Sequence, residues 1–210
     1  MNAFHSKRIW LAITIASYVW VASSNRAAAQ VDNRQTSELY KLQAAYHRAA
    51  TVRDPVNGDS AETIMARLRD ALSLFTSNAV LYLTVGSPQL DGYYRGNGDP
   101  DDAITCPMPS NDPNNRGTVC TFYKYLSPAF QAANKLVALT PSYKESFGLY
   151  GDIAAVYFEC HYFNVALDPA TQRPLWTAVS HASFKGFARK VHGHWRFAYA
   201  NGGVPPVPIP

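Results

Sequence analysis

The feature that most constrains the fold is the stretch from Leu136 to Asn201, in which apolar and polar residues alternate. Alternation with a period of two is typical of β-strands whose two faces meet different surroundings. Turn signals at Gly151-Asp152, Asp168-Pro169 and His192-Gly193 divide the stretch into consecutive strands. This part of the chain therefore predicts a large, mostly antiparallel sheet.

Helical periodicity precedes the strands. Residues 35–52 and the segment that follows Asp59 repeat apolar side chains at steps of three and four, which predicts two amphipathic helices. The repeating residues are Leu39, Leu42, Tyr46 and Ala49 in the first segment and Ile64, Leu68, Leu72 and Phe75 in the second. Asp59 with Glu62 predicts a capping box. A third helix is expected over residues 121–134, with a bend at Pro128.

The order of the elements predicts the fold class. A first strand is expected over residues 78–86, and residues 87–118, which are rich in turn residues, are expected to form a long loop. Helices, a strand, a long loop, a helix and then several antiparallel strands make an α+β arrangement. Helices then cover one face of a curved sheet.

The first 29 residues have the pattern of a secretory signal peptide. A basic start, MNAFHSKR, leads into the uncharged apolar run IWLAITIASYVWVASS, and three alanines offer a cleavage site before Gln30. The alternative is a membrane anchor, but a run of about 16 residues is slightly short for a span. We therefore expect a secreted or periplasmic protein with one domain over residues 30–204 and a Pro-rich tail over residues 205–210.

Charge argues against nucleic acid as a partner. The formal charge of +4 falls by three, to +1, when Lys7, Arg8 and Arg26 leave with the signal peptide. A domain that binds nucleic acid needs clustered Lys and Arg to displace counterions. We expect no nucleic-acid binding, and no stable membrane insertion once the signal peptide is removed.

The three cysteines fit an exported protein. Cys106 and Cys120 flank a polar loop, and a bridge between them is expected in an oxidising compartment. Closing a loop of about 15 residues stabilises a fold by roughly 3 kcal/mol in the chain-entropy model. Cys160 lies in an apolar strand and is expected to be a buried free thiol. No metal site is expected, because CxxC pairs are absent and the histidines are scattered.

Four segments resemble the nuclear transport factor two-like (cone) superfamily and its SnoaL-like branch. They are LYKLQAAYHRAATVRD, ALSLFTSNAVLYL, DGYYRG and RKVHGHWRFAY, and the resemblance extends from about Leu39 to Tyr199. It implies a cone-shaped, curved, mostly antiparallel sheet with about three helices on its concave face. It leaves the activity open, because the superfamily includes isomerases, dehydratases, cyclases and proteins without catalysis.

Two branches of the superfamily suggest catalytic positions. In the ketosteroid-isomerase branch a base sits on the first strand, where this chain has Leu83, which cannot take a proton. The scytalone-dehydratase branch uses a pair of strand histidines and an acid from the first helix, which His161, His181 and Asp54 could mimic by residue type. With Glu159 on the same strand as His161, these residues form the candidate catalytic set.

Strand alternation decides which face carries that set. A hairpin centred near Thr171 puts His161 opposite His181 and Glu159 opposite Ser183, so the four share a face. The other face is more apolar and has the small residues that close helix packing tolerates. We therefore expect Glu159, His161 and His181 on the outer face, which often forms a dimer interface in this superfamily. A one-residue bulge would reverse the assignment.

The apolar face predicts a ligand cavity. The residues expected to line it are Tyr46, Leu81, Leu83, Phe158, Tyr162, Phe184, Tyr199 and Asn201. An apolar cavity with a few polar tips is typical of small-molecule sites. The sequence thus predicts binding of a small apolar or aromatic molecule, with cofactor-free lyase, isomerase or cyclase chemistry as one possibility. The alternative is a non-catalytic binding or dimerisation module.

Overall fold

The computed structural model describes residues 33–97, 105–132, 135–138 and 144–203. The predicted signal peptide and the Pro-rich tail lie outside these residues. The chain divides into two units, Met1–Glu38 and Leu39–Pro210. Apart from the first turns of the helix over residues 33–50, every element discussed below belongs to the second unit. None of the described helices is long and apolar enough to cross a membrane.

The two expected amphipathic helices are present. The first spans residues 33–50, and α2 spans Ala61–Ser73. The predicted capping box at Asp59 is wrong, because the N-cap of α2 is Ser60, whose hydroxyl accepts a hydrogen bond from the Thr63 N–H. The Asp59 carboxylate instead accepts hydrogen bonds from the backbone N–H groups of Arg53 and Asp54, so it holds the connecting loop.

The third predicted helix is broken into short pieces. They are α3 (Val119–Thr121), the π-helical turn η1 (Phe122–Leu126) and the 3-10 turn η2 (Pro128–Phe130). Ser127 between η1 and η2 has extended backbone. Pro128 lacks the N–H that a continuous helix needs, so it starts a separate turn instead of bending one helix. The break lets η1 and η2 point different side chains toward the sheet.

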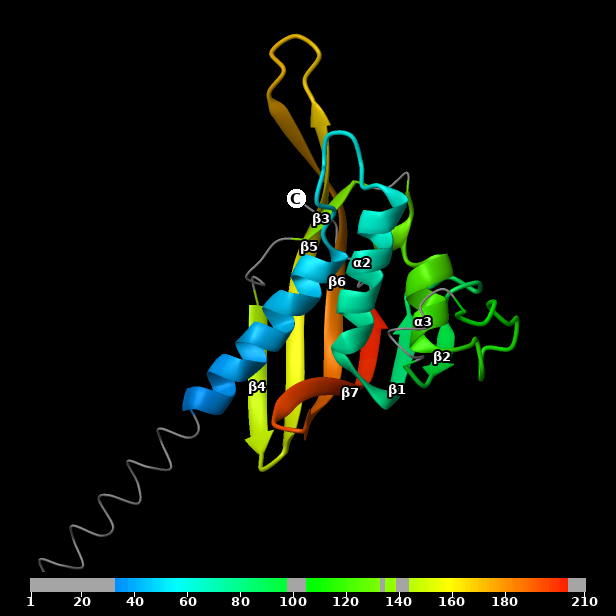
Figure 1. Cartoon of the computed structure of the whole chain (residues 1–210), viewed down its shortest axis with the longest axis vertical. Helices are drawn as coiled ribbons and strands as arrows, with labels where there is room; N and C mark the ends of the chain where they lie inside the picture. The colour runs from blue at the N-terminus through cyan, green and yellow to red at the C-terminus, as the bar shows by residue number, and fades with distance from the viewer. Residues whose placement is uncertain (1–32, 98–104, 133–134, 139–143, 204–210) are drawn as a thin grey trace, which may run out of the picture. The chain divides into compact units, whose positions relative to one another are not determined.

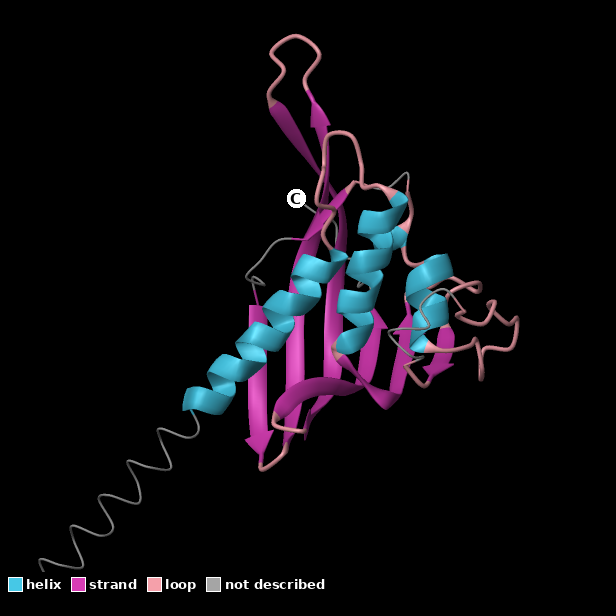
Figure 2. Cartoon of the chain, viewed as in Figure 1, coloured by secondary structure: helices cyan, strands magenta, loops and turns pink. Residues whose placement is uncertain are grey.

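The strands form one curved, seven-stranded sheet with the order β2-β1-β7-β6-β5-β3, and β4 also pairs with β5 (Figure 1). The strands are β1 (Phe75–Thr84), β2 (Gly92–Arg95), β3 (Leu136–Ala138), β4 (Lys144–Tyr150), β5 (Ile153–Leu167), β6 (Pro174–Val191) and β7 (His194–Gly203). Their pairing is antiparallel except between β1 and β7. Helices cover one face of the sheet, as the α+β prediction requires (Figure 2).

A short strand interrupts the predicted 87–118 loop. In β2, Tyr93 stacks on Tyr82 of β1 with ring centroids 4.4 Å apart, while Tyr94 points inward and is fully buried. Tyr93 and Tyr94 thus face opposite sides of β2, as neighbours in a strand do. A strand of four residues is too short for this alternation to be recognised in the sequence. The predicted disulfide between Cys106 and Cys120 is present, with Cα atoms 5.6 Å apart, and Cys160 is free and buried.

The expected register of the long hairpins is confirmed. His161 pairs with His181, and Val191 pairs with His194 across the last turn. The register shifts between Tyr162 and Phe163 along the β5–β6 ladder, and again between Phe187 and Ala188 along the β6–β7 ladder. Each shift is a β-bulge, which reassigns the residues beyond it to the opposite face.

A buried ion pair joins the helical segments. The Arg67 guanidinium lies 2.7 Å from the Asp59 carboxylate, and both side chains are at most 2% exposed. Arg67 also donates hydrogen bonds to the backbone carbonyls of Ala49 and Ala129. A buried charge is tolerated only when it is paired in this way. Arg67 thus links the end of the first helix, α2 and η2 above the sheet.

Candidate functional site

A cavity of about 290 Å³ lies between the first helix, the broken third helix and the sheet. Most of its lining is apolar, with Leu81 and Leu83 from β1 and Phe184 from β6. The half-buried Val85 and Leu90 belong to the lining beyond the end of β1. Its polar side chains are those of three tyrosines, Tyr46, Tyr123 and Tyr162, and of Ser127.

The three phenols are close neighbours. The Tyr123 hydroxyl donates to the Tyr46 hydroxyl over 3.0 Å. Burial raises the pKa of Tyr46 to about 12, and it raises the pKa values of Tyr123 and Tyr162 well above the usual range. All three side chains are therefore neutral at physiological pH. A neutral phenol can donate a hydrogen bond to a carbonyl or hydroxyl oxygen and can accept one in return.

The cavity lacks the usual groups for general-base catalysis. Among the described residues that line it, none is Asp, Glu, His, Lys or Arg. Cys160 lies behind Tyr162 with a side-chain hydrogen bond between them, and burial raises the pKa of its thiol to about 12. A base works best when its pKa is near the working pH. The described lining is thus suited to binding an uncharged molecule.

Most of the residues predicted to line the cavity do so. Tyr46, Leu81, Leu83, Tyr162 and Phe184 line it. Phe158 lies behind them and stacks on Phe184, with ring centroids 4.7 Å apart and planes 9° apart. Leu83 faces the cavity, so an apolar side chain occupies the place where the isomerase branch has its base.

The prediction that Tyr199 and Asn201 line the cavity is wrong. The bulge at Ala198 lets Phe197 pair with Ala188 while Tyr199 pairs with Phe187, an outer-face residue that is 51% exposed. Residues beyond the bulge have therefore changed faces. Gly202 reaches the cavity instead, and a Cβ atom at that position would lie 3.0 Å from Leu83.

Tyr123 is the main cavity residue that the sequence reasoning missed. It comes from η1, where the π-helical turn breaks the periodicity of an ordinary helix. Its ring also packs edge-on against Phe130 of η2, 5.4 Å away. The segment TFYKYLSPAF contains the residue, but its spacing gives no signal that Tyr123 faces the ring of Tyr46.

Three members of the candidate catalytic set, Glu159, His161 and His181, lie on the opposite face of the sheet. Glu159 and His161 alternate with the inward-facing Phe158 and Tyr162 of β5. His181 Nε2 lies 3.2 Å from a Glu159 carboxylate oxygen, and the other Glu159 oxygen accepts a hydrogen bond from the Tyr157 hydroxyl. The rings of His161 and His181 are 5.3 Å apart.

This outer cluster consists of Tyr157, Glu159, His161 and His181, of which His181 is buried and the other three are partly buried. The side chains of His181 and Glu159 are 8% and 13% exposed. The expectation that Glu159, His161 and His181 lie on the outer face is met. Asp54 is elsewhere, in a turn where hydrogen bonds from Asn57 lower the pKa of its carboxyl group. The set that resembled a dehydratase site is therefore not assembled in the cavity.

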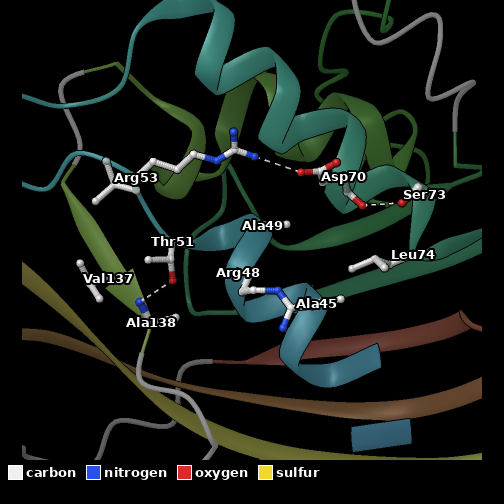
Figure 3. A pocket seen from close by; sticks show the side chains of 11 residues that line it. Ala45, Arg48, Ala49, Thr51, Arg53, Asp70, Ser73, Leu74, Val137 and Ala138 are labelled. Carbon is white, nitrogen blue, oxygen red and sulfur yellow. Dashed lines mark hydrogen bonds and ion pairs between the residues drawn. The ribbon is translucent and has the colours of Figure 1, made fainter. Parts of the chain in front are cut away.

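A second hollow of about 590 Å³ lies between the first helix, the end of α2 and β3 (Figure 3). Arg53 forms an ion pair with Asp70 across it, 3.2 Å apart, with both side chains more than half exposed. The Thr51 hydroxyl accepts a hydrogen bond from the Ala138 N–H. Exposed ion pairs of this kind contribute little energy. Within the described residues, no group of three His, Cys, Asp or Glu side chains could hold a metal ion.

No protein-family model matches this sequence, and the search of curated proteins gives no significant match. Solved structures do match it. An NTF2-like protein with a cystatin-like fold from Novosphingobium aromaticivorans has a TM-score of 0.52 and 13% identity, covering 87% of this chain and 90% of its own. A proposed dehydratase of the NTF2-like family from Streptomyces avermitilis has a TM-score of 0.53 and 10% identity, covering 83% of this chain and 99% of its own.

A third solved structure is an NTF2-like protein of unknown function from Pseudomonas putida. It has a TM-score of 0.51 and 10% identity, and the match covers 82% of this chain and 88% of its own. Identities this low show the fold alone. The chain has the NTF2-like fold that its sequence resembles, and the SnoaL-like branch stays a prediction.

Proposed function

We propose that this chain binds a small, mostly apolar molecule that carries one carbonyl or hydroxyl oxygen. The observation that supports this most directly is the hydrogen-bonded pair of neutral phenols, Tyr46 and Tyr123, inside an otherwise apolar cavity. A carbonyl oxygen can accept a hydrogen bond from such a phenol. The rest of the ligand is held by burial against Leu81, Leu83 and Phe184.

Size and energy restrict the ligand further. A volume of about 290 Å³ is at the small end of the range for ligand sites, which favours a molecule of one or two rings. Each methylene that leaves water contributes about 0.8 kcal/mol, whereas one hydrogen bond adds about 0.5–1.5 kcal/mol net. Affinity therefore comes mainly from apolar contact, and the phenols decide which oxygen-bearing molecules are preferred.

Catalysis is the second candidate function. Neutral tyrosines that stabilise a developing oxyanion can support cofactor-free dehydration or isomerisation. The dehydratase proposed in Streptomyces avermitilis has the same fold, which makes this chemistry worth testing. Binding is favoured because the described lining supplies no group that ionises near neutral pH to remove a proton.

The proposal is tested with a matched pair of ligands, acetophenone and ethylbenzene, which differ in the carbonyl oxygen. Calorimetry should show acetophenone binding about 2- to 10-fold more tightly, the value of one net hydrogen bond. Tyr46→Phe should abolish the difference, while Tyr150→Phe, at a position 72% exposed, should preserve it. Equal affinity for both ligands in the unmodified protein would contradict the proposed role of the phenols.

We also propose that the protein is exported. The basic start, the apolar run and the alanine site support a signal peptide over residues 1–29, and the Cys106–Cys120 bridge suits an oxidising compartment. N-terminal sequencing of exported protein should find Gln30 at the start. Soluble exported protein that keeps residues 1–29 would contradict this.

The outer face is proposed as a dimer interface. Ile153, Val179 and Phe187 are each about half exposed on β5 and β6, the strands that carry the outer cluster. Sedimentation should show a dimer that Phe187→Asp disrupts and that Arg173→Asp, in the distant hairpin loop, leaves intact. A monomer at millimolar concentration would contradict the dimer.

A further inference from the structure

A third groove, of about 460 Å³, lies where the β6–β7 hairpin meets the start of β1. Figure 1 shows these segments at one end of the sheet. One wall is formed by residues 76–78 of β1. The other wall carries Arg189, Lys190 and His192 from β6 and the turn, and Arg196 from β7. The groove is separate from the tyrosine cavity and shares no lining residue with it.

An irregularity in strand pairing creates the groove. On the parallel β1–β7 ladder Phe75 pairs with Phe197, and the next pair is Val80 with Tyr199. Residues 76–79 of β1 are therefore opposed by Ala198 of β7, so β1 bows away from its neighbour. Phe75 and Phe197 are buried in the core. The residues beside them, Thr76 and Arg196, consequently point to the other side, into the groove.

The groove concentrates positive charge. Arg189 and Arg196 are direct cross-strand partners, an arrangement that is unfavourable for two like charges. Within the described residues, neither guanidinium forms an ion pair with an acidic side chain, and the groove lining contains no Asp or Glu. An anion between the two arginines would remove the repulsion.

The buried hydroxyl of Thr76 is a second observation that favours an anion in this groove. Thr76 is 6% exposed, and its Oγ1 has no hydrogen-bond partner among the described residues. Buried polar groups are normally satisfied, so an exception calls for an explanation. A ligand oxygen in the groove would accept the hydrogen bond that Thr76 can donate. The exposed Ser77 and Asn78 provide further polar groups at the rim.

We propose that this groove binds an anion that carries a phosphate group, placed between Arg189 and Arg196 with one oxygen on Thr76. Two guanidinium forks match the several oxygens of a phosphate group and can each form paired hydrogen bonds. The same chemistry serves a soluble phosphate compound and a phospholipid headgroup. The site is independent of the proposed ligand cavity, so either proposal can fail without the other.

Calorimetry with inorganic pyrophosphate on the whole chain tests the site. Arg189→Gln and Arg196→Gln should each raise the dissociation constant at least tenfold, and Thr76→Val should raise it about threefold. Arg173→Gln, an exposed arginine in the β5–β6 loop, is the matched control and should leave it unchanged. Circular dichroism of each variant checks that the fold is intact, and Arg196→Lys should recover part of the affinity because it restores the charge.

Vesicles distinguish the two sources of phosphate. Sedimentation with phosphatidylglycerol vesicles, against phosphatidylcholine vesicles, should show binding that requires Arg189 and Arg196 if the ligand is a headgroup. If pyrophosphate binds and the vesicles do not, and if that binding also requires Arg189 and Arg196, the ligand is a soluble phosphate compound. Two results overturn the proposal. One is that neither probe binds, and the other is that Arg173→Gln weakens binding as much as the groove variants do.

Discussion

The two faces of β5 and β6 carry two different polar clusters. On the helix-covered face, Tyr46, Tyr123 and Tyr162 are neutral phenols in an apolar cavity. On the outer face, Glu159 and His181 are close enough to form an ion pair, with Tyr157 on the same carboxylate. A neutral phenol needs one hydrogen-bond partner when buried, whereas a buried carboxylate needs a charged or strongly polar one.

The difference between the two polar clusters suggests different roles for them. The phenols of the cavity face are uncharged, and Tyr46 accepts a hydrogen bond from Tyr123. The outer cluster pairs Glu159 with His181 and Tyr157, so it is suited to holding β5 and β6 in register. We propose that the cavity serves ligand recognition and that the outer cluster serves stability.

The largest expected effect contrasts two phenylalanines on neighbouring strands. Phe158 is 1% exposed and packs against Phe184 and Tyr46, whereas Phe187 is 51% exposed on the outer face. Phe158→Ala should lower the free energy of unfolding by about 3–5 kcal/mol, the usual cost of emptying a packed aromatic site. Phe187→Ala should cost less than about 1 kcal/mol. Urea unfolding measures both, and equal losses would contradict the assignment of faces.

Alkaline pH should lower the free energy of unfolding through the buried phenols of the cavity face. The Tyr46 phenol stays neutral in the folded protein up to its pKa of about 12, while in the unfolded chain it ionises near its ordinary value of 10.0. Its stabilising contribution is therefore complete below pH 10 and is lost as the pH rises toward 12. The loss from this group is about 2–3 kcal/mol across the window. Urea unfolding at pH 9, 10 and 11 measures the decline.

Tyr46→Phe should make that decline shallower, and Tyr150→Phe, on an exposed side chain, should not change it. A wild-type stability that is flat from pH 10 to pH 11 would show that the phenols are already ionised or exposed. That result would remove the basis for calling them neutral hydrogen-bond donors.

Substitutions in the outer cluster should lower the free energy of unfolding by a smaller amount, and the effects of Glu159 and His181 should be coupled. Glu159→Ala leaves the largely buried His181 without its carboxylate, at a cost of about 1–3 kcal/mol. In a double-mutant cycle with His181→Ala, the coupling energy should be at least about 0.5 kcal/mol. Lys185→Ala, exposed on the same face, should change stability by less than about 0.5 kcal/mol. Additive effects of the two cluster variants would mean that the pair contributes nothing as a pair.

Sequence patterns predicted the parts of the fold that follow one period. The register of His161 against His181 follows from alternation and a turn near Thr171, because a hairpin fixes the positions on both sides of it. The pattern failed at the bulge by Ala198, which moved Tyr199 and Asn201 away from the cavity. A bulge inserts one residue without changing composition, so the sequence alone gave no sign of it.

The other features could not be predicted from sequence periodicity, mainly because they involve irregular backbone. Tyr123 reaches the cavity from a π-helical turn, and the phosphate groove depends on four β1 residues that are opposed by Ala198 of β7. Asp59 was expected to cap α2, but its partner Arg67 is eight residues further along the same segment and holds it in the interior. The Tyr123 contact and the groove depend on packing between segments that are distant in sequence, which local spacing does not report.

The central claim is that the tyrosine-lined cavity is the ligand site. The most direct measurement is nuclear magnetic resonance of the complex with acetophenone labelled with ¹³C at its carbonyl. If the ligand occupies the cavity, its ring should contact the Leu83 methyl groups, and its carbonyl should show a downfield shift that Tyr46→Phe reduces. Contacts with Val179 or Phe187 on the outer face, together with a carbonyl shift that Tyr46→Phe leaves unchanged, would contradict it.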